Sequence, residues 1–129
     1  MRARTAILAG YLATIGCAPP IPDGGFNSPD PASRAYAVIQ LVRDYRGPNA
    51  TNEGTPPARD LEPMVTMLDS ADPMNRFLAS QALRELTGEN LGYDPAAAFP
   101  IRALAARRWQ AWVDDLRNRE TTKPEPRTT

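Results

Sequence analysis

The chain of 129 residues contains no histidine and a single cysteine, Cys17. Without histidine it has no imidazole for acid–base catalysis, and one thiol can form neither an internal disulfide nor most zinc sites. Fifteen basic and fifteen acidic residues balance to zero net charge, which gives the chain no electrostatic reason to bind nucleic acid or anionic lipid. We therefore expect no metal, no cofactor, no nucleic acid and no small-molecule substrate.

Common catalytic motifs are also missing from the sequence. There is no glycine-rich phosphate loop and no Gly-x-Ser-x-Gly elbow. Adjacent helical residues point about 100° apart, so Asp114 and Asp115 do not converge on a substrate as a glycosidase pair must. Asp69 and Asp72 flank a helix corner, where capping explains at least one of them. The sequence predicts a protein that is not an enzyme, and a carboxylate hydrolase is the least favoured alternative.

No segment alternates apolar and polar residues for long enough to predict a β-strand. Fourteen prolines are too many for long uninterrupted helices. We predict an all-α fold built from short helices, in one small domain.

Residues 1–16 have the composition of an export signal. Arg2 and Arg4 precede an apolar run from Ala6 to Ile15. As a helix this run would span about 15 Å, half of a hydrocarbon core of about 30 Å, which is too short for a permanent transmembrane anchor.

The residues after this run, Thr14-Ile15-Gly16-Cys17, resemble the lipobox of bacterial lipoproteins, although leucine is usual where Thr14 stands. The resemblance implies that Cys17 is lipidated, that it becomes the first residue of the mature protein, and that the protein is anchored to a bacterial envelope membrane, facing the periplasm. The alternative is an ordinary signal cut after Ala18, which would place Pro19 directly after the scissile bond.

The rest of the chain divides by composition. Residues 17–29 form a proline- and glycine-rich tether, residues 30–119 a helical domain, and residues 120–129 a charged tail predicted to be disordered. Within the domain we expect helices over residues 30–46, 61–69, 73–86 and 100–119, with loops over residues 47–57 and 88–99.

The two central helices are predicted to form a hairpin around the corner Ser70–Pro73. Asp72 can cap the second helix, Pro73 suits its first position, and Gly88 can end it in a left-handed conformation. Apolar residues fall on one stripe of each helix: Leu61, Met64, Val65 and Leu68 in the first, and Ala79, Ala82, Leu83 and Leu86 in the second. The last helix has its predicted apolar side at Ile101, Leu104, Ala105, Trp109, Trp112, Val113 and Leu116.

An internal repeat links the first helix to this hairpin. At an offset of 42 residues, Asp30-Pro31, Arg34, Ala37 and Leu41 match Asp72-Pro73, Arg76, Ala79 and Leu83. This offset lies in the range of about 40–47 residues found in helical-hairpin solenoids.

Residues 72–86 are similar to the second helix of a HEAT repeat, with Asn75 where that family prefers valine. The resemblance covers residues 30–116 and implies a short HEAT-like stack of about two hairpins, with unpaired helices at its ends. It also implies that Asp72 and Arg76 hydrogen-bond within and between hairpins. The alternative is an unrelated four-helix bundle.

Trp109 and Trp112 lie three residues apart on the last helix. The favoured interpretation is that they cover the last hairpin, and the alternative is that they stack on cell-wall glycan. We predict a lipid-anchored interaction or scaffold module of the bacterial envelope that binds an unidentified envelope protein. A glycan-binding module is the alternative function.

Overall fold

The computed structural model describes residues 24–123, so the predicted signal segment, Cys17 and the end of the predicted tail lie outside the described residues. Within this range the chain forms one 3-10 turn and four α-helices and no strand, which confirms the predicted all-α class. The elements are η1 (Gly25–Asn27), α1 (Pro31–Arg46), α2 (Ala58–Met67), α3 (Pro73–Thr87) and α4 (Phe99–Thr122). None of the helices between residues 24 and 123 is both long and apolar enough to cross a bilayer.

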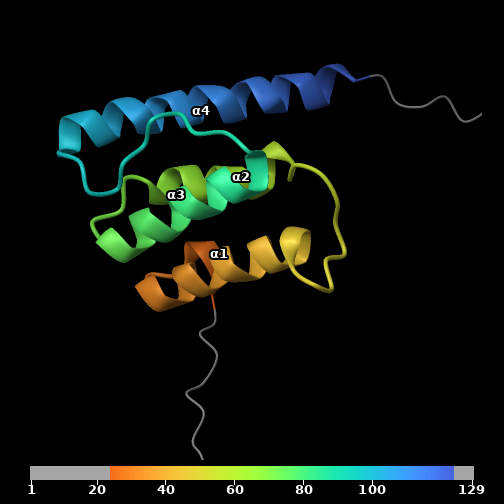
Figure 1. The fold of residues 1–129 in the computed structure, drawn as a ribbon, viewed down its shortest axis with the longest axis horizontal. Coiled ribbons are helices and arrows are strands. Elements are labelled where there is room, and N and C mark those ends of the chain that lie inside the picture. The colour runs from red at the N-terminus through yellow and green to blue at the C-terminus, as the bar shows by residue number, and fades with distance from the viewer. Residues whose placement is uncertain (1–23, 124–129) are drawn as a thin grey trace, which may run out of the picture.

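The helices form three tiers (Figure 1). The hairpin of α2 and α3 lies in the middle, α1 packs on α3 from one side, and α4 packs on α2 from the other. The stripes predicted for the two central helices are buried, with Leu61, Leu83 and Leu86 fully inaccessible. Val38 of α1 and Trp109 of α4 join the same apolar core.

The predicted corner between α2 and α3 is present. The Asp72 carboxylate accepts a hydrogen bond from the Met74 amide at 2.8 Å, and Pro73 is the first helical residue. Gly88 ends α3 with a left-handed φ of 74°, which glycine adopts without steric cost.

The direction of α4 differs from that of a tandem repeat. Arg117 pairs with Glu62 at 2.6 Å, and the Glu120 carboxylate accepts from the Ala58 amide at 3.0 Å, so the end of α4 lies beside the start of α2. The helix α4 is therefore antiparallel to α2, whereas a second HEAT-like hairpin would place it parallel. For α4 to run in this direction, residues 88–98 must return along the whole length of α3 before α4 begins. Eleven extended residues span about 36 Å, which exceeds the length of about 22 Å of α3.

The helix α4 also ends later than predicted, at Thr122 rather than near Arg119. The first residues of the predicted tail, Glu120 to Thr122, are helical because the Glu120 contact with α2 extends the packing of this helix. At the other end of the domain, part of the predicted tether is ordered. Phe26 in η1, which belongs to the predicted tether, packs against the core.

Two residues of the predicted apolar side of α4 are not covered. The side chains of Ile101 and Leu104 are 59% and 53% exposed. The buried side of α4 is narrower than the predicted stripe because α2 covers only the strip that contains Ala105, Trp109 and Val113.

We predict that Leu83→Ala lowers the free energy of unfolding by about 2–5 kcal/mol, the usual cost of emptying a buried leucine site. Leu83 is fully buried in α3, and the exposed neighbour Gln81 offers the matched control Gln81→Ala. Urea unfolding followed by circular dichroism measures both. A loss below about 0.5 kcal/mol for Leu83→Ala would contradict the packing described here.

Candidate functional site

Of the residues singled out in the sequence, Asp72 and Arg76 lie together at the start of α3. Arg76 donates from Nη1 to the carbonyl oxygens of Ser70 at 2.9 Å and Ala71 at 3.0 Å, the two residues before the Asp72 cap. Both charged side chains thus hold the corner in place. They serve the fold within one hairpin.

The same corner recurs at the start of α1, 42 residues earlier. Arg34 donates from Nη1 to the carbonyl oxygens of Ser28 at 2.7 Å and Pro29 at 3.0 Å. The Asp30 amide donates to the Ser28 hydroxyl at 3.1 Å, as the Asp72 amide donates to Ser70 at 3.2 Å. The internal repeat is therefore present in the hydrogen bonds of the two corners as well as in the amino-acid sequence.

Asn75 joins the two corners, a role that the sequence pattern did not reveal. It is completely buried. With the amide oriented to satisfy both neighbours, its nitrogen lies 3.2 Å from the Pro31 carbonyl oxygen and its oxygen 3.2 Å from Nη2 of Arg34. A valine here could make neither bond, so the departure from the HEAT-like pattern has a structural reason.

The two tryptophans differ in exposure. Trp109 is only 1% exposed and packs in the core, whereas Trp112 is partly buried beside it. Their rings meet edge to face, with centroids 6.0 Å apart and an interplanar angle of 69°. The buried face of Trp109 is not available for stacking on a ligand, so the pair does not form an open platform.

Tyr93, in the segment between α3 and α4, closes the same region of the core. It is buried, and its hydroxyl donates to the carbonyl oxygen of Leu68 at the end of α2. Burial raises the pKa of the Tyr93 phenol above 10.0, and the nearby Arg102 and Arg76 guanidinium groups oppose this rise.

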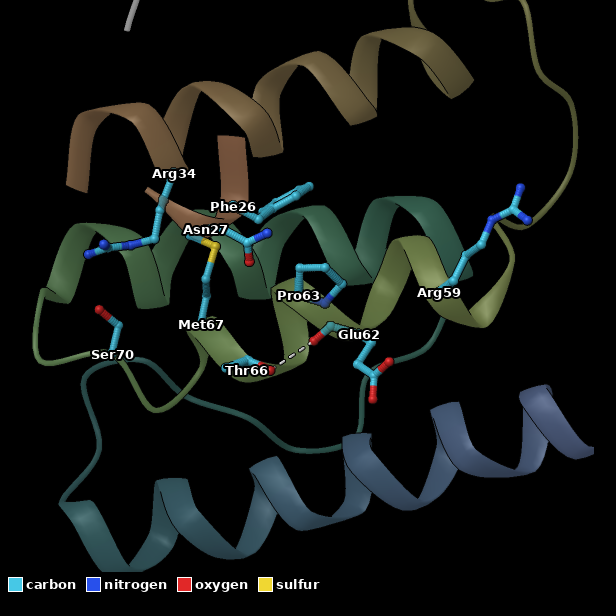
Figure 2. A pocket seen from close by; sticks show the side chains of 9 residues that line it. All are labelled: Phe26, Asn27, Arg34, Arg59, Glu62, Pro63, Thr66, Met67 and Ser70. Atoms are coloured by element: carbon cyan, nitrogen blue, oxygen red, sulfur yellow. Dashed lines mark hydrogen bonds between the residues drawn. The ribbon is translucent and has the colours of Figure 1, made fainter. Parts of the chain in front are cut away.

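A cleft of about 440 Å³ lies where η1 and α1 meet α2 (Figure 2). Three of its polar side chains are engaged elsewhere in the fold: Arg34 holds the first corner, Thr66 donates to the Glu62 carbonyl oxygen at 3.2 Å, and the Glu62 carboxylate pairs with Arg117. The side chains that line it mix charged, polar and apolar types: Phe26, Asn27, Arg34, Arg59, Glu62, Pro63, Thr66, Met67 and Ser70. This arrangement holds no nucleophile activated by a base.

The two adjacent carboxylates of α4 have structural partners. Asp114 pairs with Arg117 at 3.3 Å and Asp115 with Arg119 at 3.1 Å, so the adjacent aspartates turn to different arginines. Among residues 24–123 no group of three potential metal ligands lies together.

Comparisons of the chain with known protein families, with curated proteins and with solved structures find no match.

We predict that the two tryptophans respond differently to iodide. The variant Trp112→Phe, which keeps the buried Trp109, should emit at short wavelength and resist quenching. The variant Trp109→Phe, which keeps the partly buried Trp112, should be quenched more readily. Equal, strong quenching of both variants in their folded state would contradict the packing of Trp109.

We predict that the folded state loses stability as the pH rises from about 10.0 through the higher pKa that Tyr93 has in the fold. The sign follows because the unfolded chain releases this proton at a lower pH than the folded chain. Urea unfolding between pH 9 and pH 11 measures the effect, and Tyr93→Phe should make the pH dependence less steep. An unchanged slope in that variant would mean that other groups cause the loss.

Proposed function

We propose that this chain is a lipid-anchored, non-enzymatic interaction or scaffold module of the bacterial cell envelope. The observation that carries the proposal is the order of Arg2 and Arg4, an apolar run, the lipobox-like residues before Cys17, and then a small helical domain. An acylated Cys17 would hold the domain at a membrane, facing the periplasm. Two or more acyl chains provide stable anchoring where a single chain does not.

We infer that α1, α2 and α3 form a HEAT-like unit. Support comes from the equivalent corners at Asp30 and Asp72, and from α1 and α3 running in the same direction, as the second helices of successive repeats do. The N-terminal ends of α1 and α3 meet at Asn75. Near their C-terminal ends, Arg46 of α1 donates to the Leu86 carbonyl oxygen of α3 at 2.9 Å. The antiparallel α4 would then be a closing helix that covers α2.

The structural contacts of the polar side chains favour a non-enzymatic role. The carboxylates of Asp72, Asp114 and Asp115 and the arginines of the two corners are engaged in caps, ion pairs and carbonyl contacts. Glycan binding through Trp109 and Trp112 is less well supported than protein binding because Trp109 is buried in the core.

We predict that the mature protein begins at a Cys17 that carries lipid, and that it partitions with membranes when produced in a bacterium that processes lipoproteins. Mass spectrometry of the N-terminal peptide measures the modification. The variant Cys17→Ala should give uncleaved precursor or protein released from the membrane. A mature terminus at Pro19 without lipid would refute the anchor and leave an exported helical domain.

A further inference from the structure

The large apolar side chains that remain exposed gather at one end of the domain. Six are exposed among residues 24–123, and five of them belong to the first two turns of α3 and α4: Met74, Phe77, Phe99, Ile101 and Leu104, which are 47–65% exposed. The sixth, Ile39, lies in the middle of α1. The helices α1, α3 and α4 run in the same direction, so their first turns lie toward the same end of the molecule (Figure 1). We call the five residues of α3 and α4 the apolar end.

Arginines accompany this apolar end on α4. From Pro95 to Val113 the sequence contains three arginines and no acidic residue. Arg107 and Arg108 are exposed, and the Arg102 guanidinium lies 5.9 Å from the centre of the Phe99 ring. Exposed phenylalanine and leucine beside arginine is a composition that favours the headgroup region of a bilayer, where the rings enter the acyl boundary and the guanidinium groups meet phosphate.

The chain reaches the start of α1 at the same end, after η1, which lies beside the first half of α1 (Figure 1). The carbonyl oxygens of Ser28 and Pro29 are held by Arg34 at the start of α1. Six residues lie between Cys17 and Gly24, and the seven Cα-to-Cα steps that join the two reach at most about 25 Å when fully extended. A lipid on Cys17 would therefore keep Gly24 within about 25 Å of the membrane surface, a distance at which the beginning of α1 and the apolar end can reach the bilayer.

We propose that the apolar end rests in the headgroup region of the bilayer that holds the lipid anchor. This inference depends on the proposed anchoring at Cys17. To the anchor it adds a fixed orientation of the domain relative to the membrane. The first turns of α3 and α4 contact the bilayer, so the domain does not move freely at the end of its tether. The partner at this end is lipid, because the short tether lets this end reach the bilayer and the exposed Arg107 and Arg108 suit its phosphates.

The test places a photoreactive diazirine amino acid at Leu104 or at Phe77 in the full-length chain, within membranes of the producing bacterium. Ile39 is the matched control, since it is an exposed apolar residue outside the apolar end. After illumination, mass spectrometry of the labelled peptide counts phospholipid adducts and protein adducts separately. We expect lipid adducts at positions 104 and 77 several-fold above those at position 39. The double variant Arg107→Glu and Arg108→Glu should reduce the adducts at position 104.

Three outcomes would overturn the inference: equal lipid adducts at all three positions, adducts mainly to a second copy or another protein at position 104, or no adducts there. The N-terminal peptide of the same membranes is analysed in parallel. A lipidated Cys17 combined with any of these outcomes refutes the orientation alone, whereas an unmodified Cys17 refutes the anchor together with the orientation. Unchanged circular dichroism of each labelled protein verifies that the label has not disturbed the fold.

Discussion

The burial of the α2–α3 hairpin on both of its sides is the constraint on which the rest of the structure depends. The helix α2 has ten residues and contains Pro63, and helices shorter than about 12–15 residues are marginal in water. Its stability must come from packing, and Leu61, Met64 and Leu68 are completely buried. A hairpin with apolar residues on two sides needs a cover on each, which is why α1 packs on α3 and α4 packs on α2.

The parts of the fold that could be predicted from the sequence are those with local causes. The Asp72 cap, the position of Pro73 and the left-handed Gly88 depend on residues within a few positions of one another. The repeat also has a local cause, since the arginine after each Asp-Pro pair reaches back to the carbonyl groups just before it. Asn75 could not be assigned in this way because its partners, Pro31 and Arg34, lie on another helix.

The parts that could not be predicted depend on contacts between distant residues. The eleven residues between α3 and α4 are long enough for either direction of α4, and the choice depends on contacts such as Glu120 with Ala58 and Arg117 with Glu62. The exposure of the apolar end could not be predicted for the same reason. Ile101 and Leu104 have the spacing of core residues, and only the position of α2 leaves them exposed.

The direction of α4 also bears on how the domain could bind other molecules. Solenoids gain extended binding surfaces by stacking many equivalent hairpins. Here the equivalent pair is α1 and α3, and the antiparallel α4 breaks the register in which another hairpin would follow. A role in the envelope would therefore rest on a small surface held in a fixed orientation. The proposed contact of the first turns of α3 and α4 with lipid would supply that orientation and leave the sides of α1 and α3 accessible to a protein partner.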